Sequence, residues 1–155
     1  MHESGRNQIS KAEQIEIYST VSTIHFTSAI AYQGHESENI TGLSTNRYKI
    51  SGVNIQSMQP LKYVLEFYGS DDFDSTDLDS DTFLDNIVLD MTEFPAFRVD
   101  NANQYKLNLS DLEVIYEDYD NSKELHVTLH NMSPTTKAAG AAGAVQIDFK
   151  MTPRL

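Results

Sequence analysis

The chain lacks cysteine altogether, and this absence removes several classes of site at once. Its 155 residues include no Cys and no Trp. Without thiols there is no disulfide, no thiolate zinc or iron–sulfur centre and no cysteine nucleophile. Without Trp, a flat aromatic platform for a sugar ring would have to come from the eight Tyr or seven Phe.

Positive charge is scarce. Lys and Arg number 11 against 23 Asp and Glu, which gives a formal net charge of 11 − 23 = −12. A surface of this sign repels phosphate backbones, so no nucleic-acid partner is expected. The surface of a protein partner is expected to be neutral or basic, or to be bridged to this chain by a cation.

Long apolar runs are also missing. No stretch approaches the ~20 apolar residues that cross a bilayer, and residues 1–14 (MHESGRNQISKAEQ) are polar throughout. Neither a membrane partner nor a signal peptide is therefore expected. The length suits one domain, which we place at residues 15–155, after a polar, extended N-terminal arm at residues 1–14 that orders only when bound.

Alternation with a period of two is the pattern that is present. Its clearest case is the last strand, where Val145, Ile147, Phe149 and Met151 share one face. Residues 33–46 are polar, contain two Gly and are expected to form a loop. A helix through Ile15, Tyr18, Val21 and Ile24 is the weaker alternative for the first strand. Alternation predicts the other strands within residues 15–32, 48–55, 61–67, 83–91, 97–99, 105–109, 112–116 and 125–129.

Eight or nine short strands without an amphipathic helix between them predict an all-β protein. The expected fold is an antiparallel β-sandwich, jelly-roll-like, since the jelly roll is the commonest eight-stranded form. Residues 112–116 and 125–129 flank a polar turn and are expected to form a hairpin.

The most unusual local composition is an acidic segment, residues 71–85, with seven carboxylates and no Lys or Arg. Hard cations bind several oxygen ligands, so the segment allows a calcium ion. It is not an EF-hand, because Thr82 and Val88 stand where that loop needs Gly and Glu. The alternative without a bound ion is an acidic surface loop that keeps the end of a strand in contact with water. The candidate calcium ligands are Asp71, Asp72, Asp74, Asp77, Asp79 and Asp81.

No arrangement of residues points to catalysis. His126 and His130 share one face of a strand but lie roughly 13 Å apart along it, too far to bind one metal, and are expected on the outer face. His35 falls in the expected loop. No nucleophile elbow, zinc-protease helix or phosphate-binding glycine loop occurs, so we predict no enzymatic activity and no required cofactor.

Tyrosines provide the alternative to a purely structural protein. Loop or outer-face tyrosines could stack on sugar rings, whereas in a small sandwich a Tyr more often covers the core with its hydroxyl in water. The alternative prediction is a carbohydrate-binding β-sandwich module, with calcium as an optional ligand. Its candidate residues are Tyr18, Tyr32, Tyr68, Tyr116 and Tyr119.

The C-terminal half of the chain carries a family resemblance. The segments DSDTFLDNIVLD, NQYKLNLSDLEVIYEDYD and LHVTLHNMSPTTKAAGAAGAVQIDFKM resemble small β-sandwich structural proteins of tailed-phage virions. The resemblance implies a head decoration or cement protein that binds a capsid shell through an extended arm and sheet edges. It also implies a symmetric oligomer, with a trimer favoured.

Residues and resemblance together predict a non-enzymatic structural protein of a bacteriophage virion. Its partners would be the major capsid protein, or another virion protein, and further copies of itself. It would be assembled into the virion in the host cytoplasm. Binding alone would be its mechanism, because many weak contacts repeated over a symmetric shell add up to a large stabilisation.

Overall fold

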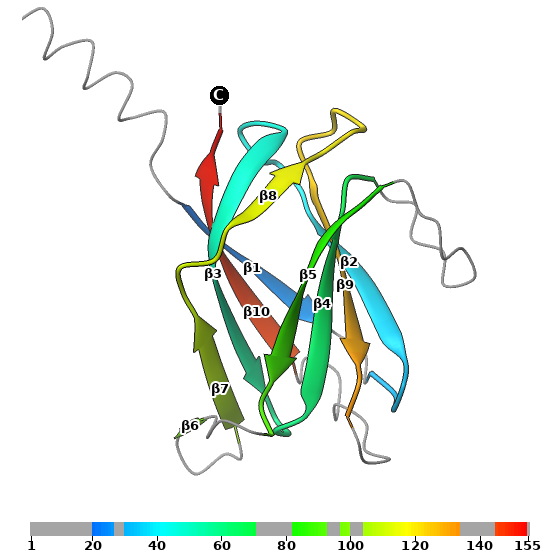
Figure 1. Cartoon of the computed structure of the whole chain (residues 1–155), viewed down its shortest axis with the longest axis vertical. Coiled ribbons are helices and arrows are strands. Elements are labelled where there is room, and N and C mark those ends of the chain that lie inside the picture. The colour runs from blue at the N-terminus through cyan, green and yellow to red at the C-terminus, as the bar shows by residue number, and fades with distance from the viewer. Residues whose placement is uncertain are drawn as a thin grey trace, which may run out of the picture.

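The fold is seen in a computed structural model that describes residues 20–26, 30–70, 82–92, 97–99, 104–133 and 145–154. Within these ranges the chain forms β-strands and no helix (Figure 1). No helix that could cross a membrane is therefore found there. The strands are β1 (Thr20–Phe26), β2 (His35–Ile40), β3 (Arg47–Ser57), β4 (Lys62–Tyr68), β5 (Phe83–Asp90), β6 (Phe97–Val99), β7 (Gln104–Leu109), β8 (Val114–Glu117), β9 (Leu125–Asn131) and β10 (Val145–Pro153).

The strands make two antiparallel sheets. Sheet A has the order β1-β10-β3-β7-β6, with β8 also paired to β3, and sheet B has the order β2-β9-β4-β5. The chain passes repeatedly from one sheet to the other, and its first and last strands are neighbours in sheet A. When the short β6 is left out and β7 and β8 are taken as two parts of one strand, eight strands remain, four in each sheet, as in a jelly roll. The predicted all-β, jelly-roll-like sandwich is confirmed.

The core lies between the two sheets. Phe149 of sheet A and Phe67 of sheet B are both fully buried, and their rings meet edge to face with centroids 6.1 Å apart. In β10, the four residues predicted to face inward are at most 1% exposed. In β3, Ile50 and Val53 both face the core because the pairing with β10 shifts between them, which adds one residue to β3.

Three tyrosines supply core volume that aliphatic side chains supply in other proteins. Tyr48, Tyr63 and Tyr116 are at most 2% exposed. Each hydroxyl has a partner, as a buried polar atom requires. Tyr63 Oη lies 2.9 Å from Ser57 Oγ, and burial raises the pKa of Tyr63 to about 12 although the bond to Ser57 opposes the shift.

One prediction about local structure is wrong at the start of sheet B. Residues 33–46 were expected to be a loop, yet His35–Ile40 form β2, an edge strand paired with β9. Main-chain pairing holds this strand without apolar alternation, because its inward positions are Glu36, Glu38 and Ile40. The alternative helix near the N-terminus is also excluded in the described part, since Val21 and Ile24 lie in β1 with exposures of 69% and 4%.

The expected hairpin of residues 112–116 and 125–129 is also wrong. Strand β8 pairs with β3 in sheet A, whereas β9 lies between β2 and β4 in sheet B. The polar residues between them cross from one sheet to the other. A sequence pattern of strand, polar turn and strand does not distinguish such a crossing from a hairpin.

Candidate functional site

The edges of the two sheets differ in how well they are protected against pairing with another chain. Inward-pointing charges and short length are two ways in which proteins protect edge strands. In β2, Glu36 and Glu38 share the inner face with Leu129 and Val127, and in β5 Asp85 is likewise on the inner face. Strands β6 and β8 are only three and four residues long.

Strand β1 has none of these protections. It is seven residues long, its sequence TVSTIHF contains no charged residue and no Pro, and within the described residues it pairs only with β10. Val21 leaves 69% of its surface exposed. This strand is therefore the edge of the molecule best suited to accept a further strand.

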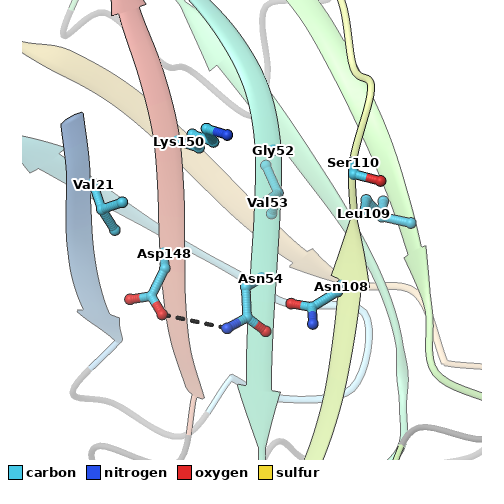
Figure 2. A pocket seen from close by; sticks show the side chains of 9 residues that line it. All are labelled: Val21, Gly52, Val53, Asn54, Asn108, Leu109, Ser110, Asp148 and Lys150. Carbon is cyan, nitrogen blue, oxygen red and sulfur yellow. Dashed lines mark hydrogen bonds between the residues drawn. The ribbon is translucent and has the colours of Figure 1, made fainter. Parts of the chain in front are cut away.

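A groove of about 500 Å³ lies beside this edge, on the outer face of sheet A (Figure 2). Gly52 of β3 has no side chain to fill the space, and Leu112 N–H bonds to Ser51 O where β7 ends and β8 begins. The lining side chains come from β1, β10, β3 and the end of β7. They are Val21, Gly52, Val53, Asn54, Asn108, Leu109, Ser110, Asp148 and Lys150.

Polar groups in the groove centre on the Asp148 carboxylate. It accepts hydrogen bonds from Thr23 Oγ1 at 2.6 Å and from Asn54 Nδ2 at 3.4 Å. The amide oxygen of Asn54 is buried and has no hydrogen-bond partner. The groove thus offers an unused acceptor, a carboxylate and the ammonium of Lys150 beside the apolar surface of Val21 (Figure 2).

The outer face of sheet B carries polar side chains in its centre. The rings of His35 and His130 lie with centroids 5.5 Å apart, and His130 Nε2 contacts a carboxylate oxygen of Glu66. Glu66 also accepts a hydrogen bond of 2.9 Å from Tyr68 Oη. The bond to His130, assisted by that of Tyr68, lowers the pKa of Glu66 in spite of its burial.

This pairing predicts an acid dependence of stability. The folded-state pKa of Glu66 lies below its ordinary value of 4.5, so its contribution is present above about pH 4.5 and is lost as the pH falls through the folded-state value. We expect Glu66→Gln to lower the free energy of unfolding by about 1 kcal/mol at pH 7. The deficit should shrink below pH 4 in urea titrations, whereas the exposed control Glu113→Gln should show no such trend. A deficit that does not change with pH would contradict the pairing.

A buried carboxylate organises the crossing between β8 and β9. Asp118 is 1% exposed. Its Oδ1 accepts the N–H of Asp120 at 3.0 Å, and its Oδ2 accepts Ser122 N–H, Ser122 Oγ–H and Glu124 N–H at 3.0, 2.7 and 3.0 Å. Burial acts to raise the pKa of Asp118, but these hydrogen bonds outweigh it and the pKa is lowered. His126 Nε2 lies 3.5 Å from Asp118 Oδ1.

This crossing also contacts Gly69, which precedes the predicted calcium segment and is bonded to Thr82. Tyr119 N–H bonds to Gly69 O at 2.6 Å, and Gly69 N–H bonds to Thr82 O at 2.7 Å. A Cβ on residue 69 would clash with the ring of Tyr119, so this close approach favours Gly. The predicted ligands themselves, Asp71, Asp72, Asp74, Asp77, Asp79 and Asp81, lie outside the described residues, and calcium binding there stays a prediction.

The tyrosines proposed for sugar stacking differ widely in exposure where the structure describes them. Tyr116 is wholly buried in the core and Tyr68 is 5% exposed, whereas Tyr32 and Tyr119 are 36% and 51% exposed. Tyr18 lies outside the described residues. An outward Tyr116 is wrong, because its hydroxyl is used inside the protein to donate to Glu124 O at 2.8 Å.

Sequence reasoning placed the outer-face histidines correctly but not their surroundings. His126 is only 3% exposed, and His35 lies in β2 instead of a loop. The groove was missed because it is formed by four strands that are not consecutive in the sequence. The crossing had a readable signal, since EDYDNSKELH places Asp118, Asp120, Glu124 and His126 at spacings of two, four and two.

No protein-family model matches the chain, and no curated protein matches it in sequence. Among solved structures it is similar to a chain of tomato aspermy virus, with 11% identity over 96% of both chains and a TM-score of 0.41. It is also similar to tobacco streak virus coat protein (6% identity, 88% and 90% of the chains, TM-score 0.31). A third similar structure is a CBM4 protein, with 13% identity, 86% of this chain and 71% of that chain covered, and a TM-score of 0.32. At these values the similarities do not decide between functions.

Proposed function

We propose that this chain is a non-enzymatic structural protein of a virion, a capsid decoration or cement protein that binds an assembled shell. The observation that carries the proposal is the unprotected β1 edge, which is uncharged, seven residues long and flanked by the groove. An extended segment of a shell subunit pairs with β1, and the main-chain hydrogen bonds of that pairing supply affinity. The jelly-roll fold is compatible with this role, since viral capsid domains use it.

The groove gives such a partner its specificity. Val21 belongs both to the edge strand and to the groove, so a strand added to β1 lies one strand away from Asp148 and Lys150 of β10 (Figure 2). Alternate side chains of an added strand point to the same face of the sheet. Long polar side chains of the partner on that face reach across β1 toward the groove, and apolar ones cover Val21.

Repetition makes a weak contact effective. Each copy adds one edge pairing, and copies repeated over a symmetric shell bind with a high effective concentration. Binding to the assembled shell alone stabilises that state by mass action. Self-association as a trimer, an additional contribution from residues 1–14 and assembly in the host cytoplasm of a bacteriophage belong to the same proposal.

Rebinding to stripped particles tests the role of the edge. Virus particles from the source of the chain are freed of it by mild denaturant, and purified variants are then added back and sedimented. We expect Val21→Lys to lower the bound fraction at least tenfold, because a charge is placed on the edge strand beside the groove. The matched control is Val88→Lys, since Val88 is 51% exposed on the opposite sheet. Full rebinding of Val21→Lys would contradict the proposal.

Carbohydrate binding is the second candidate function, and the amide oxygen of Asn54 favours it. The buried, unpartnered Oδ1 of Asn54 suits a ligand that carries hydroxyl donors, and Asp148 lies beside it. Binding of a glycan on an array, abolished by Asn54→Ala and unaffected by Val88→Lys, would favour this function. Absence of binding across the array would exclude it for the glycans tested.

A further inference from the structure

Three side chains that could bind one metal ion meet where the β8–β9 crossing enters β9. One ligand atom from each of Asp118, Asp120 and His126 lies within 4.8 Å of the other two. Asp118 and His126 are buried and Asp120 is exposed, so the cluster is held by the protein on one side and open to solvent on the other. We call these three residues the Asp118 cluster.

The orientation of the His126 ring is what separates this cluster from a group of surface acids. Its Nδ1 lies 3.1 Å from Asn39 Oδ1. Because an amide oxygen only accepts, Nδ1 carries the proton and donates it to Asn39. Metal-binding histidines have this arrangement, in which the second nitrogen donates to an oxygen that fixes the ring.

The other ring nitrogen has no hydrogen-bond partner. His126 is 3% exposed, and its buried Nε2 makes no hydrogen bond. Its polar neighbours include Asp118 Oδ1 at 3.5 Å and Glu124 Oε2 at 3.9 Å. Nε2 thus faces carboxylate oxygens without a hydrogen bond, an arrangement that a bound cation between them stabilises.

The spacing fits a small transition-metal ion. Two ligand atoms at about 2.0–2.1 Å from a tetrahedral zinc ion are about 3.4 Å apart, close to the 3.5 Å between His126 Nε2 and Asp118 Oδ1. Calcium and magnesium take oxygen ligands, whereas imidazole with carboxylates suits zinc and related divalent ions. Asp118 can take part because its four hydrogen bonds fix the carboxylate in place.

We propose that Asp118, Asp120 and His126 form a binding site for zinc or a similar divalent transition-metal ion, with solvent completing the coordination. The ion fastens the β8–β9 crossing to β9 and so stabilises the end of the sandwich at which β2–β3 and β8–β9 connect (Figure 1). It is distinct from the predicted calcium site in sequence and in metal class. It does not depend on the proposed virion role.

Zinc titration of the intact protein tests the site. The protein is first treated with chelator and dialysed, and zinc affinity is then measured against a chromophoric zinc chelator. We expect one ion per chain and a Tm rise of about 5–10 °C at roughly 100 times the dissociation constant. Calcium and magnesium at the same concentration should not raise the Tm.

Asp120→Asn supplies the decisive variant because Asp120 is exposed and its substitution should not disturb the metal-free fold. Its zinc affinity is expected to fall at least tenfold while the Tm of the metal-free protein stays unchanged. Asp111→Asn removes an equal charge from an exposed turn, and His35→Gln removes the histidine whose ring centroid lies 5.5 Å from that of His130. Both controls should bind zinc as the parent does. Absence of stoichiometric binding, or loss in His35→Gln instead of Asp120→Asn, would overturn the proposal.

Discussion

Replacing Phe149 by Ala is expected to lower the free energy of unfolding by about 3–5 kcal/mol. The side chain is fully buried in β10 and meets the ring of Phe67 across the interface of the two sheets. Its loss removes apolar contact and leaves a cavity that two strand-paired sheets cannot close. Urea unfolding followed by circular dichroism measures the change.

The matched control for this substitution is Val21→Ala in the neighbouring strand β1. Val21 is 69% exposed, so its truncation should change stability by less than about 0.5 kcal/mol. The denaturant slope should stay the same in both variants, because neither changes the surface exposed on unfolding. A loss below about 1 kcal/mol in Phe149→Ala would contradict a core shared by the two sheets.

Asp118→Ala is expected to be nearly as severe, at about 3 kcal/mol. The substitution removes one acceptor group that satisfies three backbone N–H groups and one hydroxyl in the β8–β9 crossing. Hydrogen bonds to a charged partner contribute roughly 1.5–3 kcal/mol each, and water replaces only part of that on exposed Asp120 and Ser122. Thermal and urea unfolding in the presence of chelator measure this contribution without bound metal.

A graded control separates the hydrogen-bond network from a general effect on the loop. Ser122→Ala removes the Ser122 Oγ–H bond to Asp118 Oδ2 and leaves the three backbone donors in place. It should lower the free energy of unfolding by about 1 kcal/mol. Equal effects of Ser122→Ala and Asp118→Ala would show that the carboxylate does not organise the crossing.

The central strands were predictable because their burial is one-sided. In β10, apolar residues alternate with polar ones. The structure buries Val145, Ile147, Phe149 and Met151 and leaves Gln146, Asp148 and Lys150 on the outer face. Such a pattern fixes both the presence of a strand and its inward face. The change of phase between Ile50 and Val53 comes from the shift in the pairing of β3 with β10, which the sequence alone does not show.

The edge strand β2 was not predictable in this way. Its inward positions include Glu36 and Glu38, so the sequence HESENI has no apolar period. The prediction of a hairpin for β8 and β9 failed for another reason. These strands pair with partners far along the chain, and no local pattern shows which sheet a strand will join.

The candidate sites also divide into one that the sequence shows and others that only the structure shows. The acidic residues 71–81 drew attention through composition, whereas the Asp118 cluster combines two ligands in a connection with one in the following strand. The spacing between His126 and His130 along one strand does not reveal the carboxylates that lie beside His126. The β1 edge and its groove needed the sheet order, because their residues come from four strands.

Quantitative mass spectrometry of gradient-purified virus particles tests the central claim most directly. Particles from the source of the chain are separated by density, and the amounts of this chain and of the major shell protein are measured in each fraction. A decoration protein predicts that the chain bands with the particles at a fixed ratio to the shell protein. Its presence only in the soluble fractions, with none in the particle band, would contradict the proposed function.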